Sequence, residues 1–183
     1  MLKKYMGNLL LTPTPTVLVT SKCEKAENVL AISWAGIACS HPEYVTIAVN
    51  PKRYSYAMIL ETAKFCINIP SAEMLEAVDF CGNSSARDVD KFSACGFSKK
   101  YISDYILIEQ CKMHLLCEVR KVEKLGSHHL FIAEVVEKYA NIDEDEKVHE
   151  VLNPIVYYRP YYYKLENERL GFYGFTKNET PKN

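Results

Sequence analysis

One segment, residues 28–56, constrains the fold of this chain more than any other, because it combines two strand patterns with two turns. Residues 29–39 are small and apolar apart from a single Trp34, and residues 44–49 are rich in β-branched side chains. Turn-forming residues flank the second pattern, which closes on the sequence NPKR at 50–53. This order predicts two strands, over 29–36 and 44–49, joined by one turn.

A helix start follows directly after the second turn. Ser55 stands where an N-cap would stand, and helix-forming side chains predict a helix over 55–63. Unpaired backbone N–H groups at a helix start favour an anion, and the guanidinium of Arg53 could add two donors in a fixed fork. A capped surface helix with a solvated Arg53 is the commoner explanation of such a triplet taken alone, so both interpretations stay open.

Length and composition limit the classes of protein. The chain has 183 residues, 48% of them hydrophobic, and a net charge of -1 from 22 basic and 23 acidic residues. We predict one domain over 1–175 with a disordered tail over 176–183, no nucleic-acid partner and no membrane partner. The apolar run at 9–11 is too short for a signal sequence or a span, so we expect a cytoplasmic protein.

Seven cysteines are an odd number, and none of them forms a C-x-x-C pair. This spacing predicts neither a disulfide framework nor a zinc site, and it suits a reducing compartment. Cys66 and Cys117 lie inside apolar strand patterns, where we expect them to act as small hydrophobic residues.

Strand patterns outnumber helical ones along the rest of the chain, which predicts a barrel or a strongly bent sheet. The predicted strands cover 17–21, 29–36, 44–49, 65–69, 105–108, 113–123 and 129–139. In the long strand, alternation over 113–119 predicts one buried face. Helices are predicted over 55–63, 71–80 with Ser71 as N-cap and Gly82 past its end, and 88–95 with Gly96 as its stop.

Two further segments are candidates for ligand contact. The loop over 81–88 is small and hydroxyl-rich and precedes Lys91, although such a composition is also typical of a plain turn. The stretch 154–175 concentrates tyrosines, which could cover a planar ligand, pack in the core or form an interface with a second copy. These tyrosines are Tyr157, Tyr158, Tyr161, Tyr162, Tyr163 and Tyr173.

Placed in order, several short motifs resemble those of the flavin reductase-like proteins with an FMN-binding split barrel, and most closely the flavoredoxin branch. The motifs are NVLAISWAG at 28–36, SHP at 40–42, RYSY at 53–56, FCINIP at 65–70, CG at 81–82 with Ser85, RDVDKF at 87–92, LGSH at 125–128 leading into LFIAEV at 130–135, and LGFYG at 170–174. The resemblance implies a mainly β fold with flanking helices, a Greek-key type split β-barrel, a homodimer, and one FMN per subunit.

Carried over by position, the resemblance also implies the residues of the flavin site. Those expected at the isoalloxazine ring and ribityl chain are Ser33, Trp34, Ala35, Cys39 and Ser40. Arg53 and Ser55 are expected at the phosphate, with Ser85 and Lys91 completing the polar end. The remaining expected contacts are Asn28, Asn50 and Tyr54.

His128 lies in a turn where related flavin reductases carry Gly-Asp-His, whereas this chain has Gly126-Ser127-His128. A carboxylate beside an imidazole fixes its tautomer and raises its basicity. Since Ser127 replaces that carboxylate, we expect at most a positional role for His128, and we assign no residue to catalysis.

Three functions remain open at this point. The first is an NAD(P)H-dependent flavin reductase-like oxidoreductase, with NADH or NADPH as a transient electron donor bound without a G-x-G-x-x-G fingerprint. The second is a flavoredoxin-type electron carrier with tightly bound FMN, which exchanges electrons with small-molecule or protein partners. The third is a non-redox dimeric split barrel that binds another ligand.

Overall fold

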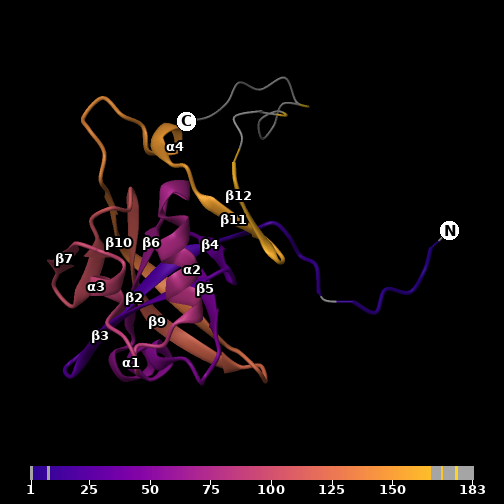
Figure 1. The fold of residues 1–183 in the computed structure, drawn as a ribbon, viewed down its shortest axis with the longest axis horizontal. Helices are drawn as coiled ribbons and strands as arrows, with labels where there is room; N and C mark the ends of the chain where they lie inside the picture. Colours follow the sequence, from indigo (N-terminus) through magenta and orange to yellow (C-terminus); the bar gives the residue numbers. More distant parts are fainter. Residues whose placement is uncertain (1, 8, 166–169, 171–175, 177–183) are drawn as a thin grey trace.

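The computed structural model describes residues 2–7, 9–165, 170 and 176, with the side chain of residue 149 left out. Seven antiparallel strands form the main sheet, in the order β3-β2-β6-β9-β10-β5-β4 (Figure 1). Their bounds are β2 Val17–Cys23, β3 Ala26–Ile32, β4 Ala35–Ser40, β5 Glu43–Val49, β6 Lys64–Ile69, β9 Met113–Lys124 and β10 His129–Ala140.

A short connection forces this sheet to close on itself. β3 and β4 lie at opposite ends of the strand order, yet only Ser33 and Trp34 separate them in sequence. Two linking residues allow at most about 11 Å between Ile32 and Ala35. The two edges of the sheet must therefore meet at this point, and the result is a barrel that is split where β3 and β4 are not paired.

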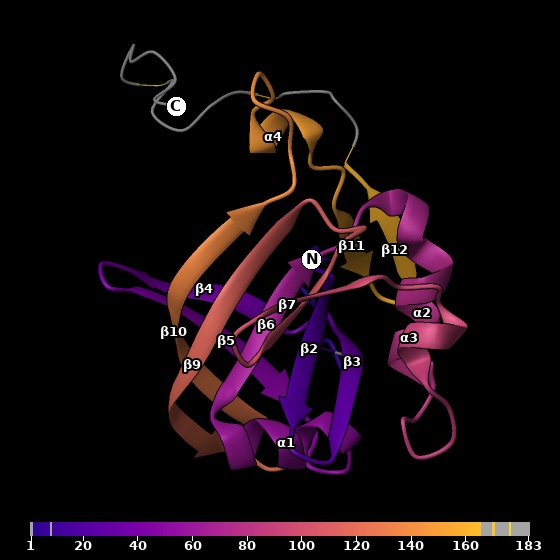
Figure 2. The ribbon, with the colours of Figure 1, turned by 90° about the vertical axis from the view of Figure 1, so that its left-hand side faces the viewer.

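Register shifts supply the curvature that closure needs. The β9–β10 ladder has irregularities at Ile132/Ala133 and Val135/Glu137, and the β4–β5 ladder has one at Ile37/Cys39. A bulge bends its strand and increases the local twist. The long strands can consequently wrap around the core instead of lying flat, as Figure 2 shows for β9 and β10.

The barrel interior is filled by alternate residues of each strand, as expected for a pleated sheet with one face inward. The cluster consists of Val17, Val19, Leu30, Ile32, Val45, Ile47, Val49, Phe65, Ile67, Cys117, Phe131 and Ala133, with Ile59 from helix α1. Helix α1, Tyr54–Thr62, crosses one end of the barrel (Figure 2). It thereby closes that end and presents its N-terminus at the split.

Helices and a hairpin cover the outside of the barrel. The 3-10 helix η1 (Ala72–Met74), α2 (Leu75–Asn83) and α3 (Lys91–Ala94) pack on the outer side of β2 and β3. A hairpin of β7 (Lys99–Ile102) and β8 (Tyr105–Ile108) covers Cys66 and Leu116. The strand β9 is therefore buried on both faces near its start, and the prediction of one buried face over 113–119 is wrong because His114 and Leu116 are buried as well.

A small third sheet joins the two ends of the described chain. It has the order β1-β11-β12, with β1 Thr14–Pro15, β11 Ile155–Tyr158 and β12 Tyr161–Lys164 (Figure 1). Helix α4 (Val148–Val151) comes directly before β11 in the sequence. Tyr162 donates to Asp79 at 3.2 Å and so ties the hairpin to α2. Tyr158, Tyr161 and Tyr163 are exposed.

Most of the predicted elements are confirmed, with shifts at their ends. The predicted strand over 29–36 is instead two strands, because the chain crosses between the sheet edges at Ser33 and Trp34. The helix predicted over 71–80 divides into η1, which Ser71 precedes without a side-chain cap, and α2, which begins at Leu75 and continues to Asn83, so Gly82 lies inside it. The helix predicted over 88–95 shortens to α3 because Asp90 caps it. Tyr173, almost all of 170–174 and almost all of the tail over 176–183 lie outside the described residues.

The described ranges contain no helix with both the length and the apolar character that a bilayer span requires. The longest, α1 and α2, have nine residues each.

The packing of the core predicts that two alanine substitutions on β10 have very different effects on stability. Phe131 is fully buried in the barrel interior, so Phe131→Ala should lower the free energy of unfolding by about 3–5 kcal/mol, measured by urea denaturation. Val136→Ala on the same strand is the control, since Val136 is 39% exposed and should change it by less than about 1 kcal/mol. Equal losses for the two variants would contradict this assignment of the core.

Candidate functional site

Two cavities meet at the split of the barrel and together form one groove. The first, of about 310 Å³, is the polar cavity, and it is lined by Asn28, Leu30, Asn50, Lys52, Arg53, Tyr54, Asn83, Ser84, Ser85, Ala86, Arg87 and Lys91. The second, of about 150 Å³, is the strand cavity, and it is lined by Leu30, Ala31, Ile32, Ser33, Trp34, Ala48, Val49, Asn50, Arg53 and His128. Leu30, Asn50 and Arg53 line both, so the two cavities are continuous.

The polar cavity has a strongly one-sided charge. Its lining includes Lys52, Arg53, Arg87 and Lys91, and none of the described residues that line either cavity is acidic. Like charges brought together in this way repel one another unless an anion lies between them. This cavity is therefore suited to a ligand group with more than one negative charge.

Local turns hold these cations in place. The backbone N–H groups of Lys52 and Arg53 donate to the side-chain and main-chain oxygens of Asn50, both at 2.9 Å. On the facing loop, Arg87 donates its backbone N–H to Ser85 at 3.2 Å and extends to the carbonyl of Lys52 at 3.4 Å. The turn after β5 and the loop after α2 are consequently linked across the cavity.

Lys91 is the buried member of the set, with only 3% of its surface exposed. Its ammonium donates to the carbonyl of Cys81 at 2.8 Å and to that of Val29 at 3.1 Å. Burial lowers the pKa of Lys91, and the positive charge of Arg53 lowers it further. An ammonium has three donors, so one remains beyond these two carbonyl bonds, and an anion in the cavity would stabilise the charged form.

Asn28 supplies an unsatisfied acceptor at the same place. It is 2% exposed, its amide nitrogen donates to the Ser55 hydroxyl at 2.8 Å, and its side-chain oxygen has no hydrogen-bond partner. A buried acceptor without a partner is unfavourable by about 1–3 kcal/mol. Because Asn28 lines the polar cavity, a ligand hydroxyl there would satisfy it.

The strand cavity is the smaller of the two, and six of its ten lining residues are apolar. It lies between β3 and β5, which are not hydrogen-bonded to each other, and the rings of Trp34 and His128 border its outer side. The rings of Trp34 and His128 are 4.5 Å apart between centroids and tilted by 52°. Burial lowers the pKa of His128, and the charge of Arg53 adds to the effect. This cavity therefore offers a slot for a planar group beside a neutral imidazole.

The turn at 126–128 places a hydroxyl group beside the imidazole of His128. The Ser127 hydroxyl lies 3.1 Å from Nδ1 of His128. A hydroxyl can orient the ring, but it carries no charge that would raise the pKa of His128. A positional role for His128 fits this arrangement.

The structure brings together most of the residues that the sequence singled out. Those that line the groove are Asn28, Ser33, Trp34, Asn50, Arg53, Tyr54, Ser85, Lys91 and His128. Ser55 is buried and bonded to Asn28, and the N-cap of α1 is Arg53, so the prediction of Ser55 as N-cap is wrong. The chain enters the helix two residues earlier because the turn at Asn50 places Arg53 in extended conformation at that point.

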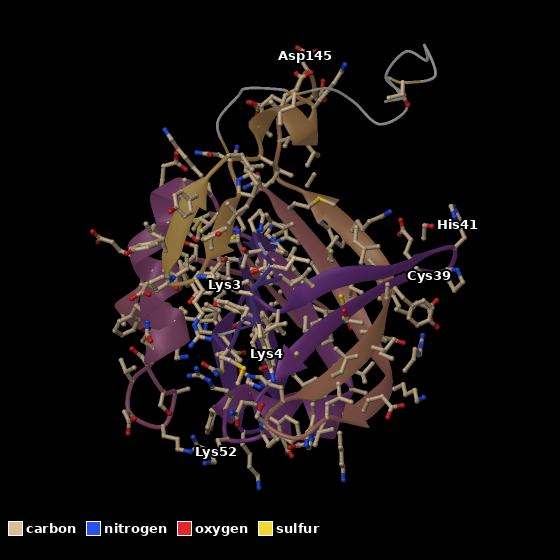
Figure 3. The ribbon with its side chains drawn as sticks, turned by 90° about the vertical axis from the view of Figure 1, so that its right-hand side faces the viewer. Lys3, Lys4, Cys39, His41, Lys52 and Asp145 are labelled. Carbon is tan, nitrogen blue, oxygen red and sulfur yellow. The ribbon has the colours of Figure 1, made fainter. Side chains whose placement is uncertain are left out.

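Three other expected residues do not line either cavity within one chain. Ala35 packs against the barrel core. Cys39 and Ser40 lie exposed near the tip of the β4–β5 hairpin, and Figure 3 shows Cys39 beside His41, far from Lys52. The bulge at Ile37/Cys39 and the length of the hairpin carry this tip away from the groove.

Sequence reasoning missed several lining residues. Among them are the cations Lys52 and Arg87, although each lies within a segment that the sequence singles out. The turn at 50–53 could have indicated Lys52, and the hydroxyl-rich loop at 81–88 could have indicated Arg87. The apolar lining from β3 and β5 carried no such signal, because which face of a strand borders a groove depends on how the sheet closes.

His128 allows a direct test of the electrostatics of the groove. Its pKa should lie below the ordinary 6.5, and Arg53→Gln should raise it by removing one of the two causes of the shift. An NMR titration of the imidazole resonances measures both values. Lys121→Gln, a change on the exposed part of β9, should leave the pKa of His128 unchanged, and an equal rise in both variants would contradict the assignment to Arg53.

Comparison with known proteins agrees with this geometry. Residues 7–166 match the family described as flavin reductase like domain, so the chain belongs to that family. An archaeal relative described as an uncharacterized protein, from Archaeoglobus fulgidus, is 30% identical over 129 residues, which cover 69% of this chain and 72% of the relative.

Solved structures support the fold. A flavoredoxin from Methanosarcina acetivorans superposes with a TM-score of 0.85 at 21% identity, over 93% of this chain and 95% of that chain. Flavoredoxin of Desulfovibrio vulgaris (Miyazaki F) gives a TM-score of 0.81 at 24% identity, over 93% and 97%. The mainly β split-barrel fold expected from the sequence is thereby confirmed.

Proposed function

We propose that this protein is an FMN-binding oxidoreductase of the flavin reductase-like type. The observation that carries the proposal is the groove itself: a cation-lined polar cavity continues into a smaller cavity between β3 and β5 at the split of the barrel. FMN has the matching shape and charge, with a phosphate at one end and a planar ring at the other.

The chemistry of the lining residues fits each part of FMN. Arg53, Lys91 and Arg87 would hold the phosphate through charge-assisted hydrogen bonds. Asn28 would accept a hydrogen bond from the ribityl chain with its unpartnered oxygen. The ring would occupy the strand cavity, where Trp34 and His128 limit its outer side.

Bound FMN would supply reversible acceptance and release of electrons, which none of the standard side chains provides alone. The residues of this chain would orient the flavin and keep water from one side of the ring. His128 would contribute position, since its lowered pKa keeps the imidazole neutral near pH 7. No acidic side chain is among the described residues of the groove, so we assign no proton transfer to this chain.

Two redox functions fit such a site, and we favour reduction of the flavin by NADH or NADPH. The support is the open outer side of the slot, where Trp34 is 52% exposed and a nicotinamide could approach. The flavoredoxin-type electron carrier stands as the second candidate, because two proteins of that name superpose on almost the whole of this chain. A non-redox split barrel remains the third.

A homodimer is also part of the proposal. The β4–β5 hairpin exposes Ile37 at 86% of its surface, with Cys39 and Ser40 beside it. Packing of a second copy against this hairpin would cover Ile37 and could bring Cys39 and Ser40 to a groove of that copy. This is how those two residues could still contact the flavin.

Arg53→Ala tests the phosphate end of the groove. Loss of a charge-assisted pair should weaken FMN binding by about 2 kcal/mol, roughly thirtyfold, measured by quenching of flavin fluorescence in a titration. Lys121→Ala is the matched control, since it removes a cation that is paired with Glu123 away from the groove. Unchanged FMN affinity in Arg53→Ala would place the phosphate elsewhere.

Anaerobic mixing of the FMN-loaded protein with NADH or NADPH separates the two redox functions. The favoured function predicts rapid bleaching of the flavin absorbance and turnover on added FMN. Absence of bleaching with either nucleotide, together with reduction by a ferredoxin-type protein, would establish the electron carrier instead. A protein that binds no FMN at all would exclude both.

A further inference from the structure

Two thiols face each other behind the polar cavity, between α2 and the residue that follows α3. The sulfur atoms of Cys81 and Cys95 are 3.8 Å apart. Both are free thiols, and Cys81 is fully buried whereas Cys95 is partly exposed. A disulfide needs about 2.05 Å between its sulfurs, so Cys81 and Cys95 would close by about 1.8 Å on forming one.

Cys95 opens into a separate cleft of about 460 Å³. The lining of this cleft, between α2 and α3, consists of Glu73, Met74, Glu76, Ala77, Phe80, Ala94, Cys95, Phe97 and Gln110. Five of its nine lining residues are apolar, and its two charged lining residues, Glu73 and Glu76, are both acidic. A small molecule can therefore reach Cys95 without entering the groove, and a cationic one is favoured over an anionic one.

The other buried cysteines lack this access. Cys66, Cys111 and Cys117 are fully buried, and none of them lines a cavity described for this structure. Cys23 and Cys39 are accessible, but neither has a cysteine within hydrogen-bond distance among the described contacts. Cys81 and Cys95 are thus the pair that combines access with proximity.

We propose that Cys95 and Cys81 form a dithiol site that is entered from the α2–α3 cleft and reacts with small cationic disulfides. In the first step, the Cys95 sulfur attacks one sulfur of the disulfide, that S–S bond breaks, and the leaving thiolate takes up the proton released by Cys95. In the second step, Cys81 attacks the Cys95 sulfur and displaces the second thiol, which takes up the proton of Cys81. Two thiols of the protein are oxidised and one disulfide is reduced to two thiols.

The surroundings support this order of attack. Burial raises the pKa of both thiols, to about 12 for Cys81, and the ammonium of Lys91 opposes the rise in both. Since a thiolate is the reactive form, the accessible Cys95 reacts first and Cys81 serves as the resolving thiol. Reaction becomes faster at mildly alkaline pH, where the thiolate fractions are larger.

Lys91 links this site to the groove. Its ammonium is anchored on the carbonyl of Cys81, and its own carbonyl accepts from the backbone N–H of Cys95 at 3.1 Å. Closing the sulfurs moves the residue that anchors Lys91, so oxidation should weaken binding of an anion in the polar cavity. This consequence, unlike the dithiol site itself, rests on the proposed FMN function.

The test uses the full chain with Cys23→Ser and Cys39→Ser, which removes the other accessible thiols, and cystamine as the cationic disulfide. After incubation at mildly alkaline pH, intact mass spectrometry should show loss of two hydrogens without added cysteamine. Peptide mapping should join Cys81 to Cys95. Oxidised glutathione, which is anionic, should react at least severalfold more slowly.

Two further variants in the same background separate the roles. Cys81→Ser should retain one cysteamine on Cys95, because the resolving thiol is gone, and Cys95→Ser should not react. A parent protein that retains cysteamine with Cys81 still free, or a Cys95→Ser variant that reacts as fast as the parent, would overturn the proposal. The result for the parent protein tests the proposal even if the variants at positions 81 and 95 fail to fold.

The link to the groove is measured on the same parent protein in its reduced and disulfide forms. The disulfide form should bind FMN about fivefold or more weakly, which is within the usual range for coupling between two sites. Equal affinity of the two forms would overturn the link and leave the dithiol chemistry standing. Absence of FMN binding to the unmodified reduced protein, which retains Cys39, would count against the proposed function instead.

Discussion

The two-residue connection between β3 and β4 is the constraint on which the rest of the structure depends. Ser33 and Trp34 join strands that lie at opposite edges of the sheet, so the sheet must curl until the edges meet. The ladder of β4 and β5 continues into this connection, where the N–H of Ala48 donates to the carbonyl of Trp34 at 2.9 Å. The Ser33 hydroxyl lies 3.2 Å from that of Thr16, which fixes the connection to the start of β2.

This closure also creates the site. The edges meet without pairing, so a slot remains between β3 and β5, and the turn after β5 brings Arg53 to its mouth. The helices on the outside of β3 then contribute Lys91 and the loop with Arg87. Burial of Lys91 with two carbonyls and no carboxylate among its described hydrogen-bond partners is unfavourable for the protein alone. We infer that this arrangement favours binding of an anion in the polar cavity at the expense of the stability of the ligand-free protein.

The sequence predicted the strands, the anion-binding turn and, through the family resemblance, most of the groove. It could not predict that residues 29–36 would divide between two strands, because local propensity is equally β-like on both sides of Ser33 and Trp34. Ser55 was misjudged because capping residues are recognised by type, whereas the entry angle of the helix was set by hydrogen bonds to Asn50. The positions of Cys39 and Ser40 relative to the groove depend on how a long hairpin projects from the barrel. The position of Arg87 depends on which loop faces the turn after β5. These features arise from tertiary contacts and leave no local pattern.

Comparison of FMN with riboflavin tests the central claim most directly, because the two molecules share the ring and ribityl chain and differ in the phosphate. Titration of the unmodified protein with each, at the same ionic strength, gives the ratio of dissociation constants. If Arg53, Lys91 and Arg87 of the polar cavity hold the phosphate, FMN should bind about a hundredfold more tightly, equivalent to two charge-assisted hydrogen bonds of about 1.5 kcal/mol each. Equal affinities for FMN and riboflavin would contradict the account.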